Sequence, residues 1–285
     1  MIEKVYQDNI STFYLFQDKY NQSRSKELFD AVQEHFNITS DINEANAVIV
    51  IGGDGTLLKV TRNPELNKLP ILALNGGTVG KNLIDITPEK IPALALSIRN
   101  KDCKFLEFPM INVEAHDENG LKHEFIAFND VFIDRYHAHT VKYQATINIR
   151  QEQLEITDSP ISGDGILIST PVGSTGYARV ISEVILPLHQ STLLVCPMAS
   201  MVLADKRKLH GFALAEHESL DVNFIDTDFR PARIAIDGVY IKNSDNEHLF
   251  VERANFKIAN KENKITLIAL SENDFIKKQM NFIAR

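Results

Sequence analysis

The sequence predicts an α/β domain built on a parallel, doubly wound sheet, followed by a β-rich domain. Three observations carry this prediction. An apolar run at residues 47–51 leads directly into a glycine-rich turn, as a buried parallel strand does. Strand-like and helix-like segments alternate up to about residue 103, which is typical of a parallel sheet. After residue 105, short strands separated by turn residues replace this alternation.

The expected elements of the α/β domain follow one another closely. They are a weak strand at 11–16, a helix at 26–36, the buried strand at 47–51, a strand at 70–74 and a helix at 88–98. A glycine-rich loop follows each of the two apolar strands, at 52–56 and at 75–80. Because ligands usually bind at the carboxyl ends of parallel strands, we expect both loops to line a ligand site.

The expected strands after residue 104 are numerous and short. They cover residues 105–114, 122–134, 141–150, 154–157, 165–170, 192–195, 220–224, 232–236, 249–251, 256–258 and 265–270, with helices at 175–186 and 274–283. We therefore divide the chain into an α/β domain at 1–104, a β-rich domain at 105–260, and a C-terminal strand and helix at 261–285. The chain order allows this last segment to pack back against the first domain.

The composition describes an ordinary globular protein and excludes several classes of function. The chain has 285 residues, of which 44% are hydrophobic and 24% charged. The net charge of −8 argues against general nucleic-acid binding. No apolar run approaches the length of a membrane span, and the first residues lack the pattern of a signal peptide. We therefore expect a cytoplasmic protein that holds any phosphate ligand with local donors or a metal ion.

Metal-site and disulfide signals are weak. Cys103 and Cys196 are the only cysteines and form no CxxC motif, which favours a reduced protein without a zinc site. His137 and His139 share a polar segment with Arg135 and Tyr136, but further ligands at suitable spacing are missing. We interpret that segment as a surface loop or a subunit contact.

The turn Gly52-Gly53-Asp54-Gly55-Thr56 suggests phosphoryl transfer. Glycines let the backbone N–H groups approach a phosphate, and a helix start adds partial positive charge. Asp54 is unexpected there, because a carboxylate repels phosphate. It is understandable if it binds a metal ion or takes a proton from an attacking hydroxyl. The alternative is a tight turn in which Asp54 only caps the helix.

A second motif runs from residue 163 to residue 177. A strand enters a proline- and glycine-containing turn, and Ser174 and Thr175 follow at a probable helix start. Their hydroxyls can cap that helix or donate to a ligand, and Tyr177 offers a flat ring and a hydroxyl. Alone, this motif is as compatible with a capped turn as with a binding site.

Together the motifs resemble the NAD kinase family. Four blocks match in order, at 52–58, 75–80, 129–131 and 163–177. The resemblance covers roughly residues 45–240, and the C-terminal strand and helix are also similar. The first block alone also resembles diacylglycerol and sphingosine-type lipid kinases, whereas the fourth is similar to NAD kinases in particular.

The resemblance implies transfer of the γ-phosphoryl group of ATP to the 2′-hydroxyl of the adenosine ribose of NAD, which gives NADP. Asp54 matches the catalytic aspartate. The implied phosphate- or nucleotide-binding residues are Gly52, Gly53, Gly55, Thr56, Lys59, Asn75 and Gly76, although Lys59 could equally be an exposed helix lysine. The implied NAD-binding residues are Asn129, Asp130, Asp164, Thr175, Gly176, Tyr177 and Val180; Asn129 and Asp130 could instead be a polar strand end.

The resemblance further implies Mg²⁺ or another divalent cation, and a site in the cleft between the two domains. It also implies a homodimer or homotetramer, formed through the β-rich domain, that binds small-molecule nucleotides. Departures from the family pattern occur at Lys81, Gly176, residues 181–183 and Val239. They leave two rival functions open: a lipid or other hydroxyl kinase, and an NAD-binding regulator without useful turnover. Polyphosphate as the donor and NADH as the acceptor also stay open.

Overall fold

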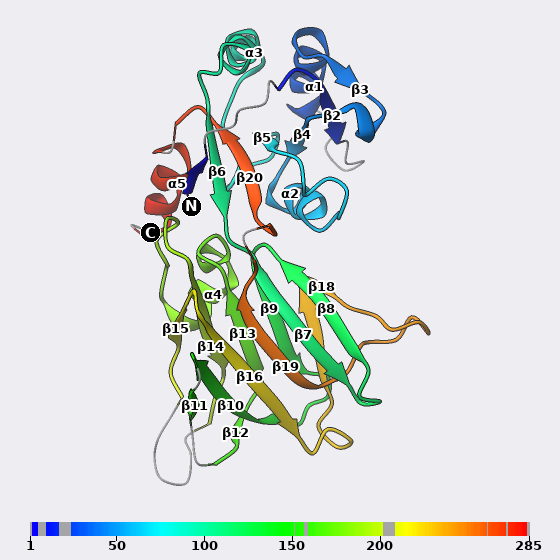
Figure 1. Ribbon diagram of the computed structural model, residues 1–285, viewed down its shortest axis with the longest axis vertical. Coiled ribbons are helices and arrows are strands. Elements are labelled where there is room, and N and C mark those ends of the chain that lie inside the picture. Colours follow the sequence, from blue (N-terminus) through cyan, green and yellow to red (C-terminus); the bar gives the residue numbers. More distant parts are fainter. Residues whose placement is uncertain are drawn as a thin grey trace. The chain divides into compact units, whose positions relative to one another are not determined.

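The chain folds into two compact units. The computed structural model describes residues 2–4, 10–16, 24–150, 152–156, 159–201, 209–260, 262–271 and 273–283. One unit comprises Met1–Phe108 with Asn263–Arg285, and the other comprises Pro109–Glu262 (Figure 1). The C-terminal strand and helix therefore return to the first unit.

The first unit contains a mixed sheet with a parallel centre. Its strand order is β1 (Ile2–Lys4), β6 (Lys104–Phe108), β20 (Ile265–Ala269), β5 (Ile71–Asn75), β4 (Ala47–Gly52), β2 (Phe13–Phe16), β3 (Ile38–Thr39). The strands from β20 to β3 pair in parallel, which confirms the predicted fold class. Strands β1 and β6 add an antiparallel edge that the local sequence pattern does not predict.

Helices cover both faces of this sheet. The helices of the unit are α1 (Arg24–His35), α2 (Asp54–Thr61), α3 (Ile91–Arg99) and α5 (Asn273–Ile283), with short 3₁₀ turns at Ile42–Glu44 and Pro88–Lys90. Ile49 and Ile51 of β4 pack with residues of α1 and α3 in one apolar cluster. Val48 and Val50 point to the opposite face and are also fully buried. Of the described helices, none is long and apolar enough to cross a membrane.

The second unit consists of two antiparallel sheets. One has the order β11-β10-β16-β19-β7-β8, with β12 also pairing with β10, and the other has the order β15-β14-β13-β9-β17-β18. Their bounds are β7 Ile111–Asp117, β8 Lys122–Ala127, β9 Asp130–Arg135, β10 Val141–Ile149, β11 Glu152–Glu155, β12 Ile161–Gly163, β13 Gly165–Ser169, β14 Thr192–Met198, β15 Phe212–Ala215, β16 Glu218–Ile225, β17 Ala232–Ile236, β18 Val239–Tyr240 and β19 Val251–Ile258. A 3₁₀ turn, Gly173–Thr175, precedes the short helix α4, Tyr177–Ser182.

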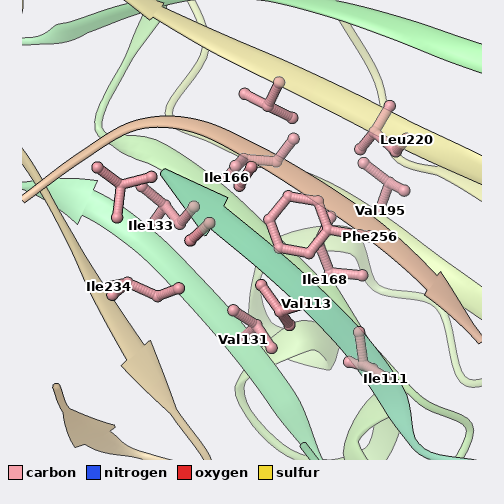
Figure 2. Close-up of a cluster of buried hydrophobic side chains, with 14 of the residues drawn as sticks. Ile111, Val113, Val131, Ile133, Ile166, Ile168, Val195, Leu220, Ile234 and Phe256 are labelled. Atoms are coloured by element: carbon pink, nitrogen blue, oxygen red, sulfur yellow. The ribbon is translucent and has the colours of Figure 1, made fainter. Parts of the chain in front are cut away.

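A single apolar cluster fills the space between these two sheets. Figure 2 shows Val113, Leu220 and Phe256 from the first sheet facing Ile133 and Ile168 from the second. All of them are buried, because alternate residues of each strand point inward.

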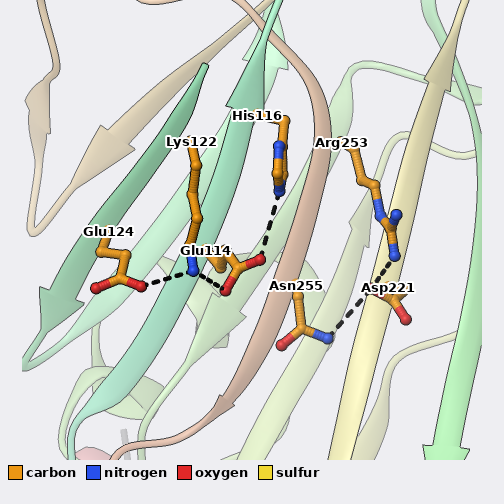
Figure 3. Close-up of polar contacts among 7 residues, drawn as sticks. All are labelled: Glu114, His116, Lys122, Glu124, Asp221, Arg253 and Asn255. Atoms are coloured by element: carbon orange, nitrogen blue, oxygen red, sulfur yellow. Dashed lines mark hydrogen bonds and ion pairs between the residues drawn. The ribbon is translucent and has the colours of Figure 1, made fainter. Parts of the chain in front are cut away.

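The opposite face of the first sheet is polar. Figure 3 shows the Lys122 ammonium between the carboxylates of Glu114 and Glu124, at 2.8 Å from each. Asn255 and Arg253 of β19 reach Asp221 of β16 at 3.2 and 3.4 Å. The more exposed of these ion pairs contribute little stability, but they keep the face hydrated.

Several predicted elements differ from the observed ones. The expected strand 105–114 is two strands in different units, β6 and β7, because Pro109 cannot donate a ladder hydrogen bond. The expected strand 122–134 is also two strands, β8 and β9. The expected strand 249–251 contributes only its last residue to β19, Val251–Ile258, which also contains the expected strand 256–258, and the charged residues between them are exposed. The expected helix 175–186 shortens to α4, which ends at Glu183 in a left-handed conformation (φ 58°). Residue 157 of the expected strand 154–157 lies outside the described residues.

The core of the second unit can be tested at Phe256, whose side chain is fully buried. We expect Phe256→Ala to lower the free energy of unfolding by about 3–5 kcal/mol, because it removes a ring and leaves a cavity. The matched control is its exposed neighbour Lys257, for which Lys257→Ala should change stability by less than about 0.5 kcal/mol. Denaturant unfolding measures both, and equal effects of the two substitutions would contradict this core.

Candidate active site

The structure brings the two glycine-rich loops of the first unit together. Gly52, the last residue of β4, pairs in register with Asn75, the last residue of β5. The Gly76 N–H donates to the Gly52 carbonyl at 2.9 Å. A Cβ atom at Gly77 would lie only 3.5 Å from Gly53 Cα. The predicted phosphate-binding residues of the two blocks therefore lie in one region.

The N-terminus of α2 is open to a ligand. A Cβ atom at Gly53 or Gly55 would meet no atom within 4 Å, so the backbone faces free space at both positions. The N–H groups of a first helical turn, with the helix dipole, attract anions. The Thr56 side chain is buried, and Lys59 is exposed one turn further along the helix. Backbone groups rather than side chains would therefore hold a phosphate here.

Asp54 does not cap its own helix. The N-cap is Gly53, which has no side chain, and Asp54 is the first helical residue. Its two carboxylate oxygens instead accept hydrogen bonds from the backbone N–H groups of Lys81 and Asn82, each at 3.0 Å. These bonds fix the plane of a half-buried carboxylate beside the open helix terminus.

Asn75 organises the second loop from within. Its Oδ1 accepts the Gly77 N–H at 2.9 Å, and its Nδ2 donates to Asp85 Oδ1 at 2.5 Å. Gly80 lies directly over this amide with φ +52°, and a Cβ atom there would be 2.4 Å from Asn75 Cγ. Only glycine fits such a position. A direct contact between Asn75 and phosphate stays a prediction.

In the second unit, Asp237 holds the start of β9, where Asn129 and Asp130 lie. The Asp237 carboxylate accepts N–H donors from Phe128, Asn129 and Asp130 at 3.1, 2.7 and 3.3 Å. No local pattern in the sequence predicts this positioning role. The signal in the sequence that could have revealed it is the Asp-Gly pair at 237–238, which is typical of a tight turn. In the structure both residues have a positive φ, 48° at Asp237 and 76° at Gly238.

Asn129 and Asp130 have the properties of binding groups. Asp130 is 7% exposed. Burial and, after it, the negative charge of Asp237 raise the pKa of Asp130 to about 7. The Asn129 Oδ1 atom is buried and accepts no hydrogen bond from the described part of the chain. A buried acceptor without a partner costs free energy that a bound ligand or water can recover.

The motif at 163–177 packs against Asn129 and Asp130. A Cβ atom at Gly173 would lie 2.2 Å from the Asn129 carbonyl oxygen, so only glycine permits this approach. A Cβ atom at Gly176 would lie 4.0 Å from Asp130 Oδ2. Thr175 is buried, and its hydroxyl donates to the Val172 carbonyl at 3.2 Å. Gly176 is therefore close to the Asp130 carboxylate, whereas the Thr175 hydroxyl is bonded within its own turn.

Asp164 lies further away, at the other end of β13. Asp130 pairs with Ser169, five positions after Asp164, which corresponds to roughly 16 Å along a strand. Asp164 instead lines a pocket of about 820 Å³ together with Tyr177. The pocket also contains Arg135, whose Nε lies 2.7 Å from Asp164 Oδ1. Arg135 was not predicted as a site residue, and the surface-loop interpretation of its segment missed this pairing.

Flat and charged groups line the same pocket. The Arg233 guanidinium lies 3.9 Å from the centre of the Tyr240 ring and pairs with Asp134 at 3.1 Å. The Tyr177 ring packs on Phe132 and is 53% exposed, while Val180 is 73% exposed. Such a pocket suits a planar, polar ligand. Across the described ranges, no group of three or more His, Cys, Asp or Glu side chains could hold a metal ion.

Comparisons with known proteins identify the family to which this chain is similar. Residues 3–102 match the ATP-NAD kinase N-terminal domain. The NAD kinase of Rickettsia akari is 30% identical over 220 residues, which cover 76% of this chain and 80% of the relative. The NAD kinase of Brucella suis is 25% identical over 213 residues, which cover 75% and 77%.

Two solved structures share the fold. One is yeast NADH kinase complexed with NADH, with a TM-score of 0.79 and 16% identity over 98% of this chain and 89% of that chain. The other is an NAD kinase from Archaeoglobus fulgidus in complex with ATP, with a TM-score of 0.67 and 15% identity over 96% and 98%. The identity to the Rickettsia relative, over most of both chains, decides the assignment: this chain belongs to the NAD kinase family.

Proposed function

We propose that the protein transfers the γ-phosphoryl group of ATP to the 2′-hydroxyl of the adenosine ribose of NAD, forming NADP and ADP. One observation carries the proposal. The Asp54 carboxylate lies at the head of α2, with both oxygens oriented by Lys81 and Asn82 N–H groups and with open space beside Gly53 and Gly55. A carboxylate fixed beside an anion-binding helix terminus suits proton removal during phosphoryl transfer.

In this mechanism Asp54 acts on the acceptor hydroxyl. The carboxylate takes the proton as the ribose oxygen forms its bond to the γ-phosphorus. The bond between that phosphorus and the β,γ-bridging oxygen breaks, and its electron pair leaves with ADP. The backbone N–H groups of the α2 terminus would bind the donor phosphates.

The second unit would hold the acceptor. The ionised Asp130 carboxylate can accept both hydroxyls of a ribose diol, and the unpartnered Asn129 Oδ1 can accept a further donor. The pocket lined by Asp164 and Tyr177 would take another part of NAD, while Val180 is exposed on α4 and does not line it. Buried acceptors of this kind select ligands that present hydrogen-bond donors.

The divalent cation, Mg²⁺ in this proposal, would arrive with the triphosphate as part of the substrate. Its donors would be mainly phosphate oxygens, and Asp54 is the carboxylate that the phosphate loop offers. Bound there, the ion would neutralise charge on the transferred group. The Asp54 side chain and the glycine-rich backbone would orient the reactants around it.

We also propose a cytoplasmic homodimer or homotetramer. The assembly is inferred from the family resemblance. Both described cysteines, Cys103 and Cys196, are free thiols, which supports a reducing compartment. Light scattering after size-exclusion chromatography gives the mass of the assembly, and a monomer would reject this part of the proposal.

The deciding experiment is a coupled assay for NADP formed from NAD, ATP and Mg²⁺. Transfer of labelled phosphate from ATP to NADH or to diacylglycerol, and NADP formation with polyphosphate in place of ATP, separate the alternative substrates. Phosphorylation of the lipid but not of NAD would establish a lipid kinase. Calorimetric binding of NAD without turnover would establish a regulator.

Removing the Asp54 carboxylate tests the proposed base. We expect Asp54→Asn to lower kcat about 10²- to 10⁴-fold, because the amide cannot accept the hydroxyl proton. The calorimetric Kd for NAD should change by less than about twofold, because the proposed NAD-binding groups of the second unit, Asn129 and Asp130, are intact. Asp102→Asn, at an exposed carboxylate of the same unit, should leave kcat unchanged. Normal turnover of Asp54→Asn would exclude the proposed role.

Acceptor binding should depend on pH through Asp130. Because its pKa is raised to about 7, its carboxyl group gains a proton as the pH falls from 8 to 6 and loses acceptor capacity. We therefore expect the KM for NAD to rise roughly tenfold across this range in the wild type. Asp130→Asn should raise KM and flatten its pH profile. An unchanged pH profile in the variant would assign the titration to another group.

The same group should affect stability. The folded pKa lies above the ordinary value of 3.8, so the folded state binds the proton more tightly than the unfolded state. Stability should therefore fall as the pH rises from about 4 to 7. We expect Asp130→Asn to raise the free energy of unfolding at pH 8 by up to about 4 kcal/mol, and by much less at pH 4. An equal gain in the free energy of unfolding at pH 8 and at pH 4 would show that the effect does not come from the ionisation of Asp130.

A further inference from the structure

The orientation of the Asp54 carboxylate depends on a short turn in the second glycine-rich loop. Its two donors, the N–H groups of Lys81 and Asn82, lie between Gly80 and Leu83 in the chain. The Leu83 N–H closes this turn on the Gly80 carbonyl at 3.4 Å, which is a weak bond. The turn therefore needs another interaction to hold its two N–H groups in place.

Lys278 of helix α5 supplies that interaction. Its Nζ donates to the Gly80 carbonyl at 2.7 Å and to the Leu83 carbonyl, so it binds both ends of the turn. It also lies 2.9 Å from Asp85 Oδ2, while Asp85 Oδ1 accepts from Asn75. The three protons of the ammonium thus match three acceptors. The Lys278 side chain is only 18% exposed, which strengthens these contacts.

One of these contacts reaches Asp54 through a single peptide group. The Gly80 carbonyl accepts from Lys278, and the N–H of the same Gly80–Lys81 peptide donates to Asp54 Oδ2. The C=O and N–H of a trans peptide point in opposite directions, so the ammonium and the carboxylate bind its two ends. A cation on the carbonyl polarises the peptide and strengthens its N–H as a donor.

We propose that Lys278 is a positioning residue for the proposed catalytic carboxylate of Asp54. This inference rests on the proposed function for its catalytic consequence. The ammonium holds the turn at 80–83 and polarises its first peptide group, and the turn orients the Asp54 carboxylate. A group from the C-terminal helix thereby controls the geometry at the N-terminus of α2.

The test compares Lys278→Met with Lys277→Met, a matched change at the exposed neighbouring lysine. We expect Lys278→Met to lower kcat about 10- to 100-fold with the KM for NAD within about twofold, because a misoriented carboxylate affects the reaction and not binding. Lys278→Arg, which keeps the charge, should recover part of the loss. Lys277→Met should behave as the wild type. An unchanged kcat in Lys278→Met would overturn the inference.

A double variant separates positioning from general stability. In the Asp54→Asn background, Lys278→Met should change the residual rate by less than about twofold, because no carboxylate is left to orient. A full additional loss in the double variant would reject the route through Asp54. Should Lys278→Met fail to fold, Lys278→Gln carries the same comparison, because it loses the charge and keeps N–H donors.

Hydrogen exchange tests the contact without any turnover. Exchange of the backbone amides at 80–83 should accelerate at least about tenfold in Lys278→Met and not in Lys277→Met. Wild-type protein that forms no NADP would refute the proposed function, whereas unchanged exchange in Lys278→Met would refute the positioning role. The two failures are therefore distinguishable.

Discussion

Two backbone hydrogen bonds fix the orientation of the Asp54 carboxylate in the first unit, and the proposed chemistry depends on them. A carboxylate beside an anion-binding helix terminus would ordinarily repel phosphate or turn toward its own helix. Here Lys81 and Asn82 hold both oxygens, so the side chain keeps one orientation. The pairing of β4 with β5 places the two loops side by side, and Asn75, Gly80 and the C-terminal helix keep the second loop in shape.

The second unit uses the opposite arrangement. There a carboxylate, Asp237, holds the backbone, and the groups thus positioned are Asn129 and Asp130. In both units a carboxylate meets consecutive N–H groups, which is a strong and directional contact. The Asp237 carboxylate also lies close to the Asp130 carboxylate. Its negative charge adds to the effect of burial, and both raise the pKa of Asp130.

Local patterns in the sequence predicted most of the elements, whereas most of the candidate site residues came from the family resemblance and stay predictions. The apolar run before Gly52 predicted β4, and the glycines predicted the open turn that contains Asp54. The pattern did not reveal contacts between distant residues. Lys278 and Gly80 are separated by 198 positions, and Asp237 and Asn129 by 108, so no local periodicity reports them. The antiparallel edge formed by β1 and β6 was not predicted for the same reason. The continuous strand β19 was not predicted because its charged residues interrupt the apolar pattern.

The position of β20 has a consequence for synthesis of the chain. This strand lies between β5 and β6, yet it is made after the whole second unit. During synthesis, the sheet of the first unit therefore lacks one of its inner strands until the second unit and then β20 have been made. Domains usually fold in order from the N-terminus. Here the second unit, which is continuous in sequence, is available to fold before the first unit has all of its strands.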